Sequence, residues 1–234
     1  MRAAGGEVYA ITSEPQRLAD DARENWQLNF ETVGDPHHEI SDACRERGWL
    51  DIIVNTKTDL VRRDEEANYS HPKGYFQPGV LALNQHGRIL YRWRSVPTRR
   101  NVGGAIERPT SDHVYRQLNK ALNTNSAVTG CDAELDHDPV MDSRGIPWPL
   151  FVSILTANGW FIKPKPFPHK PGSPRVELRI LRAILRIPVF IAAWVIALMY
   201  LPPLLVGICF TAWVLWLAPK VRYINDQFQN VKPP

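Results

Sequence analysis

The feature that most restricts how this 234-residue chain can fold is a run without a charged residue, from Ile187 to Ala218. If the whole run were helical it would measure on the order of 48 Å, at about 1.5 Å per residue, against a hydrocarbon core of about 30 Å. Apolar runs of about 18 residues already indicate a membrane helix. This run also carries three tryptophans and has no polar face. We therefore expect a C-terminal helical membrane segment.

Two prolines, Pro202 and Pro203, divide the run near its middle and leave two topologies open. One is a single kinked, tilted helix, and the other is a helical hairpin that enters the bilayer and returns. The two halves, Val189 to Leu201 and Leu204 to Ala218, are each short for a full crossing. Backbone groups freed at the prolines would need partners inside the bilayer, which favours a single crossing or a shallow hairpin.

Basic residues flank the run on both sides. They are Arg175, Arg179, Arg182 and Arg186 before it, and Lys220 and Arg222 after it. Basic residues prefer the cytosolic side of a membrane, and anionic lipids there add about 1 kcal/mol for each nearby Lys or Arg. The two basic flanks slightly favour a hairpin with both ends in the cytosol. We expect residues 175–222 to bind membrane lipid, the preceding domain to face the cytosol, and residues 223–234 to form a polar tail.

The second informative stretch runs from Gly74 to Trp93. Val80 to Leu83 are apolar without a break, which is typical of a strand buried on both faces. Asn84 to Gly87 supply turn residues, and apolar residues then alternate with arginines from Ile89 to Arg94, as in a strand with one wet face. Pro78 stands just before the first strand, where its missing N–H is tolerated. The stretch predicts a β-hairpin.

Further elements are predicted on the N-terminal side of this stretch. Glu7 to Thr12 reads as a strand, and Ser13 is placed to cap a helix, with Gln16 as its capping-box partner. Asp35 and Pro36 signal the start of a second helix, which Gly48 ends. The apolar stripe of the first helix is Leu18, Ala22 and Trp26, a further strand is expected at Trp49 to Val54, and a closing helix at Thr110 to Leu122.

From Gly6 to Leu122 these elements resemble the thioredoxin-like superfamily, and within it the AhpC/TSA, peroxiredoxin-like group. The stretch GEVYAITSEPQRLADDARENWQLNFETVGDP resembles the family's strand, helix and Asp-Pro segment, and Pro78 matches its cis-Pro position. The resemblance implies an α/β fold, a truncated thioredoxin-like domain over residues 1–122 with a mixed sheet and flanking helices. It also implies an oxidoreductase of thiol-redox or antioxidant type. The alternative is another α/β domain that contains a β-hairpin.

The element that carries the family's reactive Cys is missing from the chain. Met1 already lies beside what looks like the second strand, and there is no T-x-x-C or C-x-x-C sequence. Cys44 shares a helix face with Ile40 and Ala43, which indicates a small buried apolar residue better than a redox nucleophile. The two other cysteines, Cys131 and Cys209, fall in a linker and in the membrane run.

Three functional hypotheses follow. The first is a membrane-anchored peroxiredoxin-like oxidoreductase acting near lipid hydroperoxides. The second is a redox-inactive thioredoxin-like module that binds a protein partner and is tethered by its tail. The third is an incomplete gene product whose longer form contains the Cys. Because peroxidase chemistry needs an activated thiolate, we expect no peroxidase turnover from this chain.

The remaining candidate sites are weaker. Arg99, Arg100, Gly103 and Gly104 could form a backbone nest for an anion or a plain surface loop. Residues 123–174 are expected to form a linker, and its acidic part lacks the Gly and Glu that a calcium loop needs. Within it, Trp148 to Phe167 could be a membrane-boundary or a packing segment. A net charge of +4, without basic residues interleaved with aromatics, indicates no nucleic-acid partner, and no motif indicates a metal or cofactor.

Overall fold

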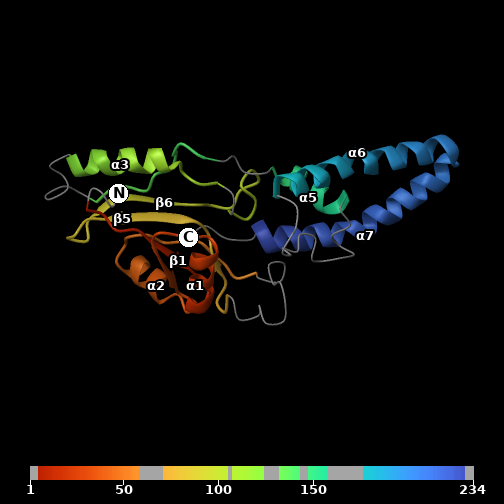
Figure 1. The fold of residues 1–234 in the computed structure, drawn as a ribbon. Coiled ribbons are helices and arrows are strands. Elements are labelled where there is room, and N and C mark those ends of the chain that lie inside the picture. The colour runs from red at the N-terminus through yellow and green to blue at the C-terminus, as the bar shows by residue number, and fades with distance from the viewer. Residues whose placement is uncertain are drawn as a thin grey trace.

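The computed structural model describes residues 5–57, 71–104, 107–123, 132–142, 147–157 and 176–229. Figure 1 shows a domain of short helices and small sheets, from which two long helices extend to one side. We call the described residues from 5 to 142 the front domain, and the two long helices the helical hairpin. Helices and strands are therefore both present, as expected, and the apolar helices lie near the C-terminus.

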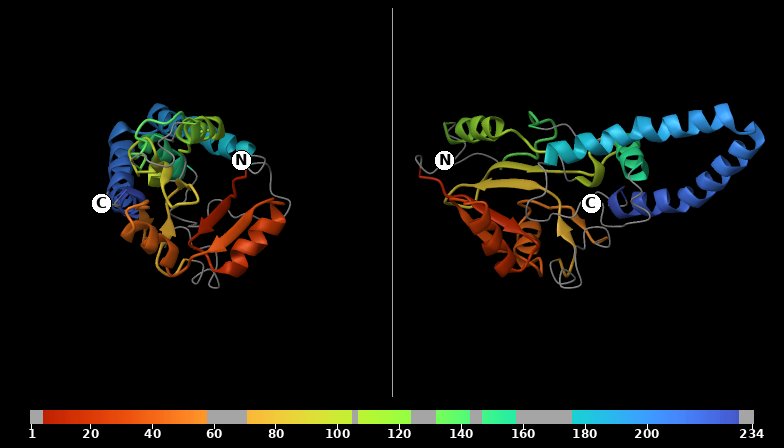
Figure 2. Two further views of the ribbon diagram at one scale, coloured as in Figure 1. Left: turned by 90° about the vertical axis from the view of Figure 1, so that its left-hand side faces the viewer. Right: turned by 45° about the vertical axis from the view of Figure 1, so that its right-hand side comes forward.

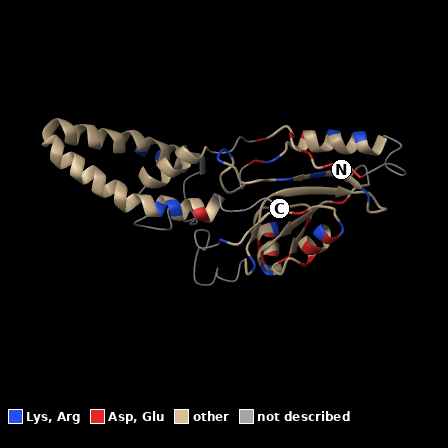
Figure 3. Ribbon diagram, turned by 180° about the vertical axis from the view of Figure 1, so that it is seen from behind, with Lys and Arg blue, Asp and Glu red and all other residues tan. Residues whose placement is uncertain are grey.

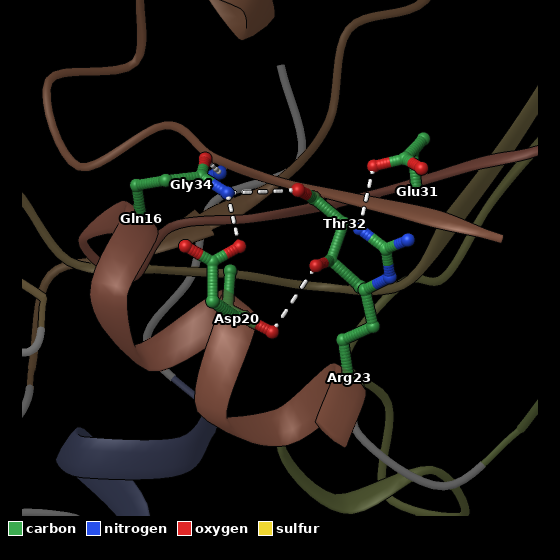
Figure 4. Close-up of polar contacts among 7 residues, drawn as sticks. Gln16, Asp20, Arg23, Glu31, Thr32 and Gly34 are labelled. Carbon is green, nitrogen blue, oxygen red and sulfur yellow. Dashed lines mark hydrogen bonds and ion pairs between the residues drawn. The ribbon is translucent and has the colours of Figure 1, made fainter. Parts of the chain in front are cut away.

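The first unit of the front domain is β1 (Tyr9–Thr12), α1 (Gln16–Asn25) and β2 (Glu31–Gly34), with the two strands parallel. The Gln16 side chain joins the start of the helix to the end of β2, because its Nε2 donates to Thr32 O at 3.0 Å and its Oε1 accepts from Gly34 N at 2.8 Å (Figure 4). A Cβ at Gly34 would lie 2.5 Å from Gln16 N, so only glycine allows this approach.

The predicted cap and buried stripe of this helix are wrong. The helix begins at Gln16 without a side-chain cap, and the Ser13 hydroxyl instead accepts from Phe76 N at 3.1 Å and lies 3.0 Å from His71 Nδ1. Trp26, the last residue of the predicted stripe, is 73% exposed, whereas Ala19 is the buried residue of the helix. Long-range contacts of Ser13 have displaced the local capping pattern.

The second helix, α2 (Glu39–Glu46), starts later than the Asp-Pro signal predicts. Asp35 is buried and still caps this helix, since its Oδ2 accepts from Ser41 N at 3.0 Å. The chain turns before the helix through His38, which has a φ of 65° and lies 4.8 Å from the Phe76 ring.

The predicted β-hairpin is confirmed as β5 (Gly79–Leu83) and β6 (Ile89–Arg94), which pair antiparallel. Gly87 takes a φ of 75° in the turn. β5 is half-buried at most, so the prediction of a strand buried on both faces is wrong. On β6, Ile89, Tyr91 and Trp93 are buried, and the strand packs on α3 (Ser111–Asn123) through a core of Tyr91, Trp93 and Leu118.

The expected single mixed sheet is not present among the described residues. Two-residue strands β3 (Val54–Asn55) and β4 (Tyr75–Phe76) pair antiparallel, so that the described residues form three separate two-stranded sheets. β1 and β5 do not pair with each other. From residue 49 to 53 the predicted strand is absent, because arginine side chains of β6 occupy its carbonyls: Arg92 Nη1 donates to Trp49 O at 3.2 Å, and Arg94 Nη1 to Asp51 O at 2.8 Å.

Residues 132–142, predicted as part of a linker, are part of the front domain. Their backbone follows β6, with Ala133 N donating to Ile89 O at 3.0 Å and Asp136 N to Arg92 O at 2.9 Å. The Asp136 carboxylate accepts from Tyr91 OH at 3.0 Å and lies 2.8 Å from His113 Nε2. Polar side chains therefore hold an otherwise turn-rich segment against the sheet and α3.

Three helices complete the fold: α5 (Trp148–Ala157), α6 (Val176–Tyr200) and α7 (Pro203–Gln229). The right-hand view in Figure 2 shows α6 running away from the front domain and α7 returning to it. The turn falls at Leu201 and Pro202, so the helical hairpin is the topology that the structure has. α5 packs at the base of the helical hairpin, where Leu155 of α5 and Ile224 of α7 form a buried pair. The sequence left a membrane-boundary role and a packing role open for Trp148 to Phe167. The described part of this stretch, α5, packs against α6 and α7, and residues 158–167 lie outside the described residues.

Candidate functional site: an apolar helical hairpin with a basic base

The helical hairpin contains two candidate membrane spans, Leu181–Tyr200 and Pro203–Phe228. Both are long and apolar enough to cross a bilayer by length and composition, and only 6% of either is buried. An apolar helix in the core of a soluble protein would be mostly buried, so these helices are exposed to whatever surrounds the protein. Near the turn the exposed side chains include Met199, Tyr200, Leu204 and Ile208.

Aromatic rings fill the space between the two helices. Trp194 of α6 lies 5.2 Å from Phe210 of α7, edge to face, and Phe190 lies 5.3 Å from Trp213. Such pairs pack helices together without polar contacts, which is how helices associate where no hydrophobic force from water acts between them. The hairpin can therefore keep its shape inside lipid.

The charges of the hairpin lie at its base, next to the front domain, and the rest of it carries none (Figure 3). The uncharged part of α6, from Ile187 to Tyr200, measures about 21 Å, and that of α7, from Pro203 to Pro219, about 25 Å. Both lengths are below the roughly 30 Å of a hydrocarbon core. The exposed basic residues at the base are Arg182, Arg186 and Arg222; Arg175 and the Arg179 side chain lie outside the described part.

One basic residue at the base is paired with a ring. Lys220 Nζ lies 4.4 Å from the centre of the Trp216 ring. A cation over an indole gains electrostatic energy from the ring, and both residue types are common where hydrocarbon meets water. This pair lies at the end of the uncharged part of α7.

The base of the hairpin is joined to the front domain by buried and charged contacts. Asn55 Nδ2 donates to Gln227 O at 2.9 Å and to Tyr75 OH at 2.7 Å, and Asn55 is 1% exposed. Lys57 Nζ lies 3.0 Å from Asp226 Oδ2. These contacts place the front domain at the end of the hairpin where both helices carry their basic residues. No sequence pattern indicated this joint, because its members are single polar residues more than 160 positions apart.

Cys44, which the sequence indicates as a small buried residue better than as a redox nucleophile, does not have the environment of a reactive thiol. Burial raises the pKa of Cys44 above its ordinary value, nearby Arg47 opposes this shift, and the Asp35 carboxylate adds to it. Nucleophilic cysteines have lowered pKa values. Cys209 is exposed on α7 and Cys131 lies outside the described residues. The peptide bond before Pro78 is trans, so this position lacks the cis geometry that the resemblance implies.

The loop at Arg99, Arg100, Gly103 and Gly104, for which the sequence left an anion nest or a plain surface loop open, uses two of its N–H groups within itself. Thr98 Oγ1 accepts from Arg100 N at 3.2 Å, and Gly104 N donates to Asn101 O at 3.0 Å. A nest needs such N–H groups to point at the anion, and here the loop uses them itself. Gly104 has two other reasons to be glycine. Its φ is 67°, which favours glycine, and an added Cβ would lie 2.9 Å from Gln77 Oε1.

Asp136, Tyr91 and His113 form a hydrogen-bonded cluster of titratable side chains in the described part of the front domain, which we call the Asp136 cluster. Burial alone would raise the pKa of Asp136, but hydrogen bonds from His113, Tyr91 and the Asp138 N–H hold that pKa below its ordinary value. Burial, and then the bond to Asp136, raise the pKa of Tyr91. Within the described ranges no three His, Cys, Asp or Glu residues are grouped to hold a metal ion. The cluster acts as a clamp between β6, α3 and residues 132–142.

Comparison with other proteins adds no family to this geometry. No protein-family model, no curated protein and no solved structure matches the chain.

Proposed function

We propose that the chain is a membrane-anchored protein whose helical hairpin enters the bilayer from one face and holds the front domain at that face. The observation that carries this proposal is the pair of unburied apolar helices, Leu181–Tyr200 and Pro203–Phe228, whose basic residues are confined to one end. Exposing this much apolar surface to water is unfavourable in free energy, and contact with lipid hydrocarbon removes that cost.

The same charges support an orientation. Both ends of the hairpin are basic, and basic flanks stay on the cytosolic side. Anionic lipids of the cytosolic leaflet would add about 1 kcal/mol for each residue such as Arg182 or Arg222 that lies near the surface. Since the front domain is fixed to the base through Asn55 and Lys57, it faces the cytosol as well.

For the front domain we propose a binding role without peroxidase turnover. The parallel strand–helix–strand unit from Tyr9 to Gly34 supports a thioredoxin-like ancestry, and the three separate sheets oppose it. The raised pKa of Cys44 supports the redox-inactive form of this proposal. A tethered domain of this kind would hold a partner at the membrane surface.

Carbonate extraction and vesicle flotation test the anchor. The full chain is expressed in cells and the membranes are washed at alkaline pH, which removes peripheral proteins. We expect the chain in the pellet, its release by detergent, and its flotation with neutral phosphatidylcholine vesicles. Recovery of the chain in the carbonate supernatant, without flotation, would contradict the proposal.

A further inference from the structure

A cavity of about 250 Å³ opens on the face of β6 that points away from the core. One part of its lining is charged, with Arg92 and Arg94 from β6 and Arg45 from α2. Leu50 and Leu135 form an apolar part. Three arginines from two elements therefore line one small space, and Asp51 is the one acidic residue among its described lining.

Arg92 carries a charge that the described residues do not compensate. Its Nη1 donates to two backbone carbonyls, Gly48 O at 2.8 Å and Trp49 O at 3.2 Å, and no described carboxylate lies within ion-pair distance. Its Nε is buried and finds no hydrogen-bond partner among the described residues. Arg92 is only partly buried, and its guanidinium has no partner of negative charge among the described residues, whereas partly buried charges are usually paired.

Arg94 lies two residues further along β6, on the same face as Arg92, and is also held by a backbone carbonyl. Its Nη1 donates to Asp51 O at 2.8 Å and lies 3.6 Å from the Asp51 carboxylate, while its Nε is also buried without a partner in the described part of the chain. The backbone carbonyls hold both guanidinium groups in fixed positions. A ligand that meets them would find donors that are already oriented.

Arg45 lies at the exposed rim of the cavity. Its Nη2 lies 2.6 Å from Asp42 Oδ1, in an exposed pair one helical turn apart. Exposed pairs of this kind contribute little to stability, so Arg45 is free to exchange its partner for an anion in the cavity.

We propose that this cavity binds the phosphate group of a small phosphate ester, with Arg45, Arg92 and Arg94 as its donors. A tetrahedral phosphate offers acceptors to several forks at once, and arginine matches this geometry better than any other side chain. The volume lies just below the range of about 300–1,000 Å³ for drug-sized ligands, which leaves room for a short apolar body against Leu50 and Leu135. The inference concerns the front domain alone and does not depend on the membrane anchor.

Isothermal titration calorimetry of the full chain in non-ionic detergent micelles tests the site. Inorganic phosphate is titrated at constant ionic strength, with chloride as the reference anion. We expect saturable binding of phosphate, weakened about tenfold in Arg45→Ala, which is the loss of about one charge-assisted hydrogen bond. The matched control is Arg116→Ala, which removes an exposed helix arginine away from the cavity and should change the affinity by less than about twofold, since distant exposed charges are screened.

A second variant keeps the charge and removes the fork. Arg92→Lys should also weaken phosphate binding by about tenfold, because lysine cannot make the bidentate contact. Circular dichroism checks its fold, and if that variant unfolds, Arg45→Ala on the rim still decides. Absence of saturable binding to the unaltered chain would overturn the proposal, and so would an equal loss in Arg45→Ala and Arg116→Ala.

Two further titrations separate the sources of the phosphate group. Tighter binding of glycerol phosphate than of inorganic phosphate indicates a soluble ester whose body contacts Leu50 and Leu135. Competition by vesicles that contain phosphatidic acid, but not by phosphatidylcholine vesicles, indicates a lipid headgroup. Either result supports the site.

Discussion

The helical hairpin leaves most of its apolar side chains exposed, whereas the front domain buries a small core of them. In the hairpin, local helices form from a continuous apolar run, and almost all of the apolar surface stays outside. In the front domain, the sheets are small and the core centres on Tyr91, Trp93 and Leu118, with buried polar side chains joining the elements. Under the proposed anchor, lipid covers the apolar surface of the first region, whereas specific contacts between distant residues hold the second. Changes should therefore affect the two regions separately.

The largest expected effect is on the hairpin. Charges introduced beside its turn, in Met199→Arg with Leu204→Arg, would have to enter the hydrocarbon, where each costs about 2.5–3.5 kcal/mol at the centre of a helix. We expect loss of carbonate-resistant membrane association. The control Tyr115→Arg adds a charge to an exposed position of α3 and should stay in the pellet. Unchanged pelleting of the double variant would show that the turn does not enter lipid.

The next effect separates two tryptophans of the front domain. Trp93 is 3% exposed in the core and Trp26 is 73% exposed on α1. Trp93→Ala should lower the free energy of unfolding by about 3–5 kcal/mol, because it removes a buried ring and leaves a cavity. Trp26→Ala should change it by less than about 0.5 kcal/mol. Chemical denaturation of the full chain in micelles measures both, and similar values for the two would contradict this core.

A smaller effect concerns the clamp at Asp136. The pKa of this carboxyl is lowered in the folded state, so its contribution to stability is present above the unfolded pKa of about 3.9 and is lost as the pH falls through the folded value. Asp136→Asn should cost about 1–3 kcal/mol at neutral pH, because Tyr91 and His113 keep a poorer partner. Thermal melts between pH 7 and pH 3 should show a weaker acid dependence in the variant. An identical pH dependence would exclude the clamp as its source.

The smallest expected effect compares two contacts between α1 and β2. Gln16 bonds to two backbone groups of β2, so Gln16→Ala should lower stability by about 1 kcal/mol or more. Arg23 and Glu31 form an exposed pair at 2.7 Å, and Arg23→Ala should cost at most about 0.2–1 kcal/mol. Denaturation midpoints rank the two, and a larger loss in Arg23→Ala would reverse this assignment.

The same contrast explains what could be predicted from the sequence. The two apolar helices and the break between them at Pro202 followed from a long uncharged run and a double proline, which are local signals; the sequence left open whether they form one kinked helix or a hairpin. The β5–β6 pair followed from turn chemistry around Gly87. The arrangement of the sheets did not, because the expected strand from Trp49 has its carbonyls bound by arginine side chains of β6, more than 40 positions away.

The surroundings of the candidate residues could not be predicted for the same reason. Cys44 and the loop at Gly104 were considered from local patterns, whereas their environments are set by residues that the chain brings in from elsewhere. The joint between Asn55 and Gln227 and the cavity at Arg92 consist of single polar residues without a spacing pattern. Only the folded arrangement shows that they meet.

The central claim, that both ends of the hairpin lie on the side of the front domain, is tested most directly by cysteine labelling. Cys44, Cys131 and Cys209 are replaced by Ser, and single cysteines are placed at three exposed positions: Leu178 at the base of α6, Tyr223 at the base of α7, and Tyr115 in the front domain. Sealed vesicles of both orientations are treated with a membrane-impermeant maleimide. We predict that all three cysteines label from the cytosolic face alone; labelling of the Leu178 and Tyr223 positions from opposite faces would contradict the account.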